Sequence, residues 1–349
     1  MPLDWLTEDL PTPSEIKLAQ SASVSDLNFV QKSRDTIIQI LEGKDPRKLL
    51  IVGPCSVHDP IATYDYAMRL KTIKEQIAES FFLIMRVYFE KPRTSLGWKG
   101  FLHDPKLDGS HHTAEGLIET RKLLKKITAE EIPVAAEILD PATPNYLSDL
   151  ISWGCVGART VTSQIHRQMA SHLPLPIGFK NSIDGNVDVA LHAIETSHYP
   201  HTFIGLNNNG KLSLVRSFGN PYSHLVLRGG ESAPNYAPEK VAEMLKKLKN
   251  KKLAERLIID CSHDNSRKKH FNQIEVFNSV IDQMIAGAPI RGLMLESFIE
   301  AGNQRINPFK PLRYGQSITD SCLDISSTLT LILNGHKRLQ ESTCATSSS

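Results

Sequence analysis

The chain has 349 residues, of which 40% are hydrophobic and 22% are charged, and its formal net charge is only +2. These values are typical of a soluble globular protein and exclude a general electrostatic attraction to nucleic acid or to a membrane surface. No signal peptide and no stretch near the roughly 18 apolar residues of a membrane span is found, and five scattered cysteines without a CxxC pair indicate a reducing compartment. We therefore expect a cytoplasmic protein.

The N-terminal region differs in composition from the remainder of the chain. Residues 1–28 are polar and interrupted by proline, which predicts an arm leading into a short helix capped by Ser14. Apolar residues at helical spacing then predict a helix from Ser25 to Glu42.

From Leu49 onward, apolar runs that predict buried strands alternate with helical segments. The eight strands are expected at 49–56, 82–89, 133–139, 156–160, 176–181, 224–230, 257–263 and 291–297. Helices are expected at 114–126, 145–153, 238–252 and 271–286, among others. Eight strand and helix repeats are typical of a (β/α)8 TIM barrel, which we expect over residues 29–335.

Two segments lie outside this repeat. Residues 202–218 contain two short alternating runs around Asn207-Asn-Asn-Gly210, which predicts a β-ribbon inserted after the fifth strand. Residues 336–349 end in small polar residues, and we expect a flexible tail there.

Cationic residues recur at the carboxyl ends of the predicted strands, where barrel enzymes have their active sites. They are Arg86, Lys91, Arg93, Arg159, Lys180 and Arg228. Arginine binds phosphate or carboxylate through two hydrogen bonds and lysine acts as a point charge, so this set suits phosphorylated substrates. A basic surface loop is the alternative for Lys91-Pro-Arg-Thr94 taken alone.

A second group combines soft and hard metal ligands. Cys55, His263, Glu296 and Asp320 would fit a divalent manganese, iron, cobalt or zinc ion better than magnesium. The alternative is a buried cysteine beside an unrelated acid. Lys180 leaves a further alternative open, since a lysine at a strand end could form a Schiff base in a metal-free aldolase.

Several motifs together resemble one family, the metal-dependent 3-deoxy-D-arabino-heptulosonate 7-phosphate synthases of the feedback-regulated type found in enteric bacteria and yeast. The motifs are Gly53-Pro-Cys-Ser-Val-His-Asp59, Lys91-Pro-Arg-Thr94, Gly97-Trp-Lys-Gly100, Gly157-Ala-Arg-Thr160, Gly178-Phe-Lys-Asn181, Leu227-Arg-Gly-Gly230, Asp260 to His263 and Glu296-Ser297. The resemblance runs from about Leu27 to about Leu333. It implies a (β/α)8 barrel that condenses phosphoenolpyruvate with erythrose 4-phosphate in the first step of the shikimate pathway.

The resemblance also implies roles for individual residues. Cys55, His263, Glu296 and Asp320 would bind one divalent metal ion. Arg86, Lys91, Gly157, Ala158, Arg159, Lys180 and Arg228, with Glu137, would surround phosphoenolpyruvate. Lys91, Pro92, Arg93, Thr94 and Asp320 would contact erythrose 4-phosphate. Lys180 would be a general acid or a phosphate ligand, and His166 or Glu137 could handle protons or water.

Regulation and assembly are implied in the same way. Regulated members form homodimers or homotetramers and bind an aromatic amino acid effector, here expected near Thr143 to Leu147, Met169 to Leu173 and the ribbon from Phe203 to Val215. The arm of this chain is several residues shorter than is usual in that family. Two alternatives stay open: an octulosonate 8-phosphate synthase that uses arabinose 5-phosphate, and a catalytically dead barrel that binds an effector.

Overall fold

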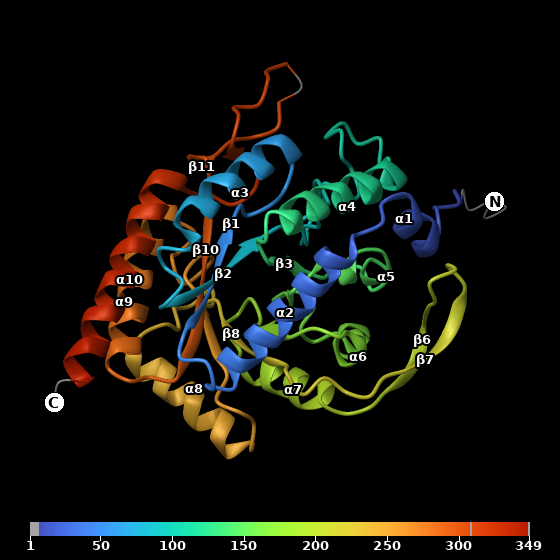
Figure 1. Ribbon diagram of the computed structural model, residues 1–349. Coiled ribbons are helices and arrows are strands. Elements are labelled where there is room, and N and C mark those ends of the chain that lie inside the picture. The colour runs from blue at the N-terminus through green and yellow to red at the C-terminus, as the bar shows by residue number, and fades with distance from the viewer. Residues whose placement is uncertain (1–6, 308, 348–349) are drawn as a thin grey trace.

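Eight parallel strands close into a barrel at the centre of the protein. The computed structural model describes residues 7–307 and 309–347 (Figure 1). The barrel strands are β1 (Lys48–Gly53), β2 (Phe81–Arg86), β3 (Val134–Glu137), β4 (Trp153–Val156), β5 (Ile177–Lys180), β8 (His224–Leu227), β9 (Leu257–Asp260) and β10 (Ile290–Phe298). They hydrogen-bond in that order, and β1 pairs with β10 from Leu49↔Gly292 to Gly53↔Glu296, which closes the barrel. The predicted (β/α)8 fold is confirmed.

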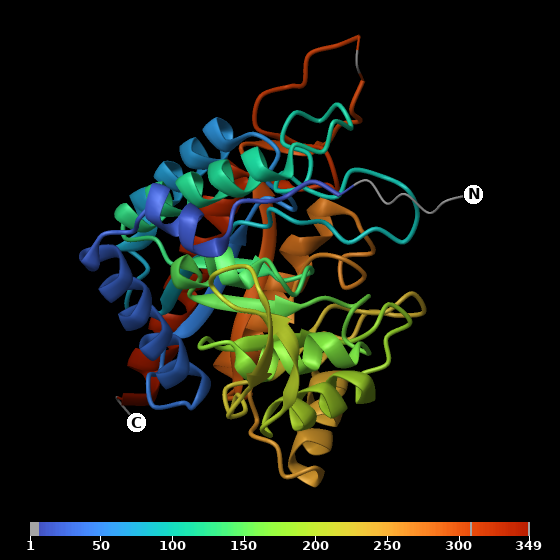
Figure 2. The same ribbon diagram turned by 90° about the vertical axis from the view of Figure 1, so that its right-hand side faces the viewer.

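Helices surround the barrel, as Figures 1 and 2 show. They are α2 (Val24–Leu41), α3 (Pro60–Lys74), α4 (Thr113–Ala129), α5 (Pro144–Leu147), α6 (Gln164–His172), α7 (Asp188–Ser197), α8 (Pro238–Asn250), α9 (Gln273–Ile285) and α10 (Ile325–Ser347), with 3-10 turns at Ser148–Leu150 and His270–Asn272. Among residues 7–307 and 309–347, no helix combines the length and the apolar character needed to cross a membrane.

The expected helix at 145–153 and the expected strand at 156–160 are wrong in their bounds. The helical segment ends at Leu150, and β4 already begins at Trp153. The apolar spacing before Trp153 suggests a continuing helix, but the Trp153 indole is completely buried and its N–H donates to His224 Nε2 at 3.0 Å. This aromatic side chain fills the barrel interior, so the strand starts earlier and residues 157–160 form a turn.

The arm contains α1 (Pro13–Ala19), whose cap is Thr12 and not the expected Ser14. Thr12 Oγ1 accepts from the Glu15 backbone N–H, and the Glu15 carboxylate accepts from the Thr12 N–H, which is a capping box. Ser14 instead donates its hydroxyl to the Asn208 carbonyl at 2.8 Å, which ties the arm to the ribbon. Residues 1–6 of the predicted arm lie outside the described residues, and the arm ends earlier than expected because α2 begins at Val24.

The predicted ribbon is present between β5 and β8. β6 (Thr202–Leu206) and β7 (Leu212–Arg216) pair antiparallel and stand away from the barrel beside α1 (Figure 1). Ile204, Leu212 and Leu214 are exposed on it.

The flexible tail expected at 336–349 is wrong for residues 336–347, which continue α10, and residues 348–349 lie outside the described residues. Polar contacts hold this part of the helix to the barrel's outer layer. His336 Nδ1 lies 2.9 Å from Ser80 Oγ, and Arg338 Nη1 donates to Asn278 Oδ1 at 3.2 Å. Leu339 also packs against the core, so the small polar residues at the chain's end do not govern this segment.

Three short strands follow β10 and return across the carboxyl ends of the barrel strands. They are β11 (Glu300–Asn303), β12 (Gln316–Ser317) and β13 (Leu323–Asp324), and β13 pairs with β10 through Ser297↔Leu323. This return places Thr319 and Asp320 above the barrel.

Candidate functional site

A cavity of about 340 Å³ opens at the carboxyl ends of the strands. This is the end at which (β/α)8 enzymes place their active sites. The lining residues are Lys91, Pro92, Arg93, Glu137, Ala158, Arg159, Lys180, Ile183, Arg228, His263, Lys268, Ile318, Thr319 and Asp320. Most of the predicted site residues therefore meet in one place.

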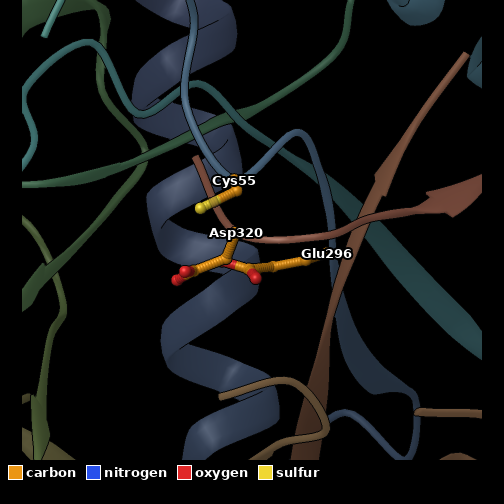
Figure 3. Close-up of side chains that lie close together, drawn as sticks. All are labelled: Cys55, Glu296 and Asp320. Carbon is orange, nitrogen blue, oxygen red and sulfur yellow. The ribbon is translucent and has the colours of Figure 1, made fainter. Parts of the chain in front are cut away.

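Cys55, Glu296 and Asp320 come together at one wall of this region (Figure 3). One ligand atom from each of the three lies within 4.8 Å of the others. Glu296 is opposite Gly53 in the β10–β1 pairing, so strand register brings it beside the loop that carries Cys55.

Two hydrogen bonds bring the distant Asp320 segment to the Cys55 loop. The Cys55 N–H donates to Cys322 Sγ at 3.4 Å, and the hydroxyls of Ser56 and Thr319 are 2.7 Å apart. Cys55 and Cys322 are 267 positions apart in the sequence, and Ser56 and Thr319 are 263 apart. These contacts therefore explain how two distant parts of the chain meet.

His263, the fourth predicted ligand, lies beside this cluster. Its Nε2 is 3.7 Å from Glu296 Oε1. Its backbone is in the left-handed region, with φ of +53°, which is uncommon for a residue other than glycine and is often found at functional sites. The His263 ring is not part of the group of ligand atoms that lie within 4.8 Å of one another, which comprises Cys55, Glu296 and Asp320 among the described residues. A thiol and two carboxylates with an imidazole beside them form a donor set that fits a transition-metal dication.

Electrostatics around Cys55 keep its thiol protonated. Burial and the charge of Glu296 raise the pKa of Cys55 to about 12, although Lys91 acts in the opposite direction. Lys91 Nζ donates to the Cys55 carbonyl at 3.1 Å and lies 3.2 Å from its sulfur. Burial acts to raise the pKa of Asp320 as well, but the charge of Lys91 and other cations outweighs it, and that pKa is lowered.

Lys180 is buried among acidic groups. Its Nζ lies 3.2 Å from Asp260 Oδ2 and 3.8 Å from Glu137 Oε2. Burial acts to lower the pKa of Lys180, but the charges of Asp260, Cys155 and Glu137 outweigh it and raise that pKa. A Schiff-base lysine must reach the neutral amine, so this environment argues against the metal-free aldolase.

Asp260 is completely buried and joins two parts of the site. Its Oδ2 faces Lys180 and also lies 2.9 Å from His263 Nδ1. Burial acts to raise its pKa, but the neighbouring His263 side chain and the Lys180 ammonium hold that pKa well below the usual range. Asp260 is thus an ionised carboxylate inside the barrel.

Some of the predicted site residues are not among those that line the cavity: Cys55, Arg86, Thr94, Gly157, Glu296 and His166. Arg86 is fully buried, donates to Glu296 Oε1 at 2.9 Å and lies over the Tyr88 ring at 3.7 Å, so it forms the layer behind the cluster. A Cβ at Gly157 would lie 2.1 Å from Glu137 Oε1, so a larger residue there would require that carboxylate to move.

The remaining cations hold polar contacts at the rim. Arg159 Nε donates to Thr94 Oγ1 at 2.7 Å, which joins two predicted substrate loops. Arg228 donates to the Asp264 carboxylate. The Lys91–Lys99 loop is closed by a backbone hydrogen bond of 2.9 Å from Lys91 N to Lys99 O, so Arg93 and Thr94 occupy a defined loop above the cavity.

His166 is not among the residues that line the cavity. It lies in α6, where its Nε2 is 2.7 Å from the Leu139 carbonyl and its Nδ1 is 2.8 Å from Ser163 Oγ. A carbonyl only accepts, so Nε2 carries the proton and both ring nitrogens are engaged. The structure does not bring His166 to the site.

Asp260, Ser262, Ile183 and Lys268 also belong to the site, although the sequence predicts no role for them. Asp260 and Ser262 have a sequence signal, because they precede His263 by three residues and one residue at the end of β9. Ile183 and Lys268 follow β5 and β9 in loops whose paths the sequence does not reveal.

A closed (β/α)8 barrel whose strand ends gather cations around a thiol and two carboxylates defines a barrel enzyme with an anion site and a candidate metal site. The chain belongs to the DAHP synthetase I family, whose sequence pattern matches residues 16–331.

Relatives support this assignment along nearly the whole chain. The Tyr-sensitive phospho-2-dehydro-3-deoxyheptonate aldolase of Salmonella typhimurium is 44% identical over 332 residues, covering 95% of this chain and 93% of that protein. The Trp-sensitive enzyme of Escherichia coli is 44% identical, with 93% of each chain covered. The solved structure of a phospho-2-dehydro-3-deoxyheptonate aldolase from Francisella tularensis has a TM-score of 0.94 at 42% identity, covering 96% of this chain and 98% of that one.

Proposed function

We propose that this protein condenses phosphoenolpyruvate with D-erythrose 4-phosphate and water to give 3-deoxy-D-arabino-heptulosonate 7-phosphate and phosphate. The observation that carries the proposal is the convergence, in a DAHP synthetase I barrel, of the Cys55, Glu296 and Asp320 cluster with a cavity lined by Lys91, Arg93, Arg159, Lys180 and Arg228. The product is the first intermediate of aromatic amino acid synthesis by the shikimate pathway.

Phosphoenolpyruvate would lie at the deep end of the cavity. Its carboxylate and phosphate require several cations, and Lys91, Lys180, Arg159 and Arg228 supply them. The backbone at Gly157 and Ala158 would lie against the substrate. Arg86 lies behind the cavity wall, where it donates a hydrogen bond to Glu296, and its positive charge would act on the substrate from there.

Erythrose 4-phosphate would lie nearer the opening. Arg93 and Thr94, carried by the closed Lys91–Lys99 loop, would hold its phosphate, and Pro92 would stiffen that loop. Asp320 lines the same cavity and would face the hydroxyl end of the sugar.

Cys55, His263, Glu296 and Asp320 would hold one divalent ion of manganese, iron, cobalt or zinc. When bound there, such an ion supplies Lewis-acid polarisation of the aldehyde. Arg86 balances the charge of Glu296 at 2.9 Å, and Lys91, 3.2 Å from the Cys55 sulfur, would balance the thiolate that forms when the ion binds.

In the proposed reaction, C3 of phosphoenolpyruvate forms a bond with the aldehyde carbon of erythrose 4-phosphate. Water adds at C2, and phosphate leaves from the resulting hemiketal. Lys180 is protonated between Asp260 and Glu137, so it would be the general acid or a phosphate ligand. Glu137 lines the cavity and would handle the proton of the attacking water, a role that we no longer give to His166.

The reaction is tested by following the ultraviolet absorbance of phosphoenolpyruvate with purified protein. We expect consumption with erythrose 4-phosphate but not with arabinose 5-phosphate, lost after EDTA treatment and restored by Mn²⁺. Consumption with arabinose 5-phosphate would support the octulosonate alternative. No consumption with either aldehyde would support the dead barrel.

We also propose that an aromatic amino acid regulates the enzyme. A second cavity, of about 260 Å³, lies where the effector site is expected. Its lining includes Lys17 of α1, Asn145 of α5, Met169 and Leu173 of α6, and Phe203 and Val215 of the ribbon. Relatives are named Tyr-sensitive and Trp-sensitive, which supports an aromatic ligand for this mostly apolar pocket.

Removing residues 1–20 would delete the Lys17 side of this second cavity. We expect reduced inhibition by whichever of phenylalanine, tyrosine and tryptophan inhibits the intact protein. Unchanged inhibition would mean that the arm has no part in regulation, and Phe203→Ala would then test the ribbon side alone.

We further propose a homodimer or homotetramer in the cytoplasm. Ile204, Leu212 and Leu214 expose an apolar face on the ribbon that a partner subunit would cover. A reducing compartment would keep Cys55 available as a ligand. Light scattering should give a mass of two or four chains, reduced by Leu214→Asp.

A further inference from the structure

The residues before His263 form a chain of contacts that ends on its ring. The Asp260 Oδ1 atom accepts two hydrogen bonds from Ser262, one from the backbone N–H at 3.1 Å and one from the hydroxyl at 2.7 Å. Ser262 Oγ in turn lies 2.7 Å from His263 Nδ1. Asp260 and Ser262 are both buried, so water does not compete for these groups.

The direction of each hydrogen bond follows from the number of protons. A serine hydroxyl has one proton, and an ionised carboxylate only accepts. The Ser262 proton therefore goes to Asp260, and Ser262 Oγ accepts from His263. This requires the proton of the neutral His263 ring to be on Nδ1.

A second contact points the same way. Asp260 Oδ2 lies 2.9 Å from His263 Nδ1. The two atoms are not aligned for a hydrogen bond, but a negatively charged oxygen this close electrostatically favours a proton on Nδ1 over a lone pair. With the proton on Nδ1, the lone pair is on Nε2, the nitrogen that lies 3.7 Å from Glu296 Oε1 beside the candidate metal ligands.

The backbone holds the ring in this position. The His263 carbonyl accepts from Lys268 N at 2.7 Å and from Ser266 Oγ at 3.1 Å, which supports its left-handed conformation. Lys268 and Ser266 thus contact only the backbone of His263, whereas the Nδ1 side of the ring contacts Ser262 and Asp260.

We propose that Ser262 is a positioning residue. Its hydroxyl donates a hydrogen bond to Asp260 and accepts one from Nδ1–H of His263, which leaves the Nε2 lone pair directed to the metal ion. This inference rests on the proposed metal site. A histidine that binds a metal commonly donates its other N–H to a neighbouring acceptor, and loss of that acceptor typically weakens metal binding about 10- to 100-fold.

The first measurement is the tautomer of His263 in the metal-free protein. Long-range ¹⁵N–¹H correlation spectra of protein labelled at its 13 histidines distinguish the two tautomers, and the His263 signals are assigned by their absence from His263→Gln. We expect the Nδ1–H form in the wild-type protein. The Nε2–H form would overturn the inference without any Ser262 variant.

The second measurement is the affinity for Mn²⁺ alone, read from the free-ion electron paramagnetic resonance signal. We expect Ser262→Ala to lose the Nδ1–H preference and to bind Mn²⁺ about 10- to 100-fold more weakly, and Ser262→Thr, which keeps the hydroxyl, to recover both. Ser266→Ala is the matched control, because its hydroxyl contacts the His263 carbonyl and not the ring.

Only a joint change of tautomer and affinity in Ser262→Ala, absent from Ser266→Ala, supports the inference. A change in one alone, or an equal loss of Mn²⁺ affinity in both variants, would overturn it. Neither readout uses substrate, so a failure to consume phosphoenolpyruvate would overturn the proposed function and leave this inference standing.

Discussion

Replacing Asp260 with asparagine should destabilise the protein far more than the loss of an ordinary ion pair. Lys180 Nζ lies 3.2 Å from Asp260 Oδ2, and the two side chains are 2% and 0% exposed. Removing one partner of a buried pair costs about 3–5 kcal/mol, because the other charge is left without compensation. Glu137 at 3.8 Å supplies a second negative charge, so we expect the lower end, about 3 kcal/mol.

Urea unfolding of the metal-free protein, followed by circular dichroism, measures this cost. Asp188→Asn is the matched control, since it removes the same charge from the exposed Lys247–Asp188 pair and should cost less than about 1 kcal/mol. In the double variant Asp260→Asn/Lys180→Met, both charges are gone, and we expect part of the stability to return. The reasoning is refuted if Asp260→Asn costs no more than Asp188→Asn.

Three further predictions concern the site itself. The pKa of Cys55 is raised to about 12, so its thiol is protonated at pH 7.5. Binding of Mn²⁺ should therefore release one proton, which a pH-indicator dye detects. The same release in Cys55→Ala would contradict the assignment of Cys55 as a metal ligand. Arg93→Ala should raise KM for erythrose 4-phosphate about 10- to 100-fold and change KM for phosphoenolpyruvate little, and equal increases would contradict the division of the cations. Gly157→Ala would place a Cβ 2.1 Å from Glu137 Oε1, so Glu137 must move. We expect kcat/KM for phosphoenolpyruvate to fall about 100-fold. Wild-type kinetics in this variant would exclude a role for Glu137.

The fold was predictable because its signal is repeated. Buried parallel strands require continuous apolar runs, and eight such runs ending in polar residues leave few architectures. The errors fall where one side chain or one contact determines where a strand begins or a helix ends. Trp153 starts a strand because its indole fills the barrel, and α10 continues past His336 because contacts with Ser80 and Asn278 hold it.

The site was predictable to the extent that its residues lie at strand ends. Cys55, Glu296 and Lys180 follow directly from that rule, because register fixes their height along the barrel. Asp320 does not, since its position depends on the return of the chain and on the Cys55–Cys322 and Ser56–Thr319 contacts. His166 was a candidate only through the family resemblance, and its ring nitrogens contact Ser163 and the Leu139 carbonyl, which the sequence could not show.

The contacts of Asp260 suggest why the two halves of the site are built on one strand end. A single carboxylate contacts the Lys180 ammonium with one oxygen and the Ser262 hydroxyl with the other, and through Ser262 it reaches the His263 ring. A shift of β9 by one residue would turn Asp260 away from the barrel interior, because side chains alternate along a strand. The cation proposed for phosphoenolpyruvate and the ligand proposed for the metal would then lose their common support together. Strand register, which sets the hydrophobic core, thereby also sets how the Lys180 ammonium and the His263 ring lie relative to each other.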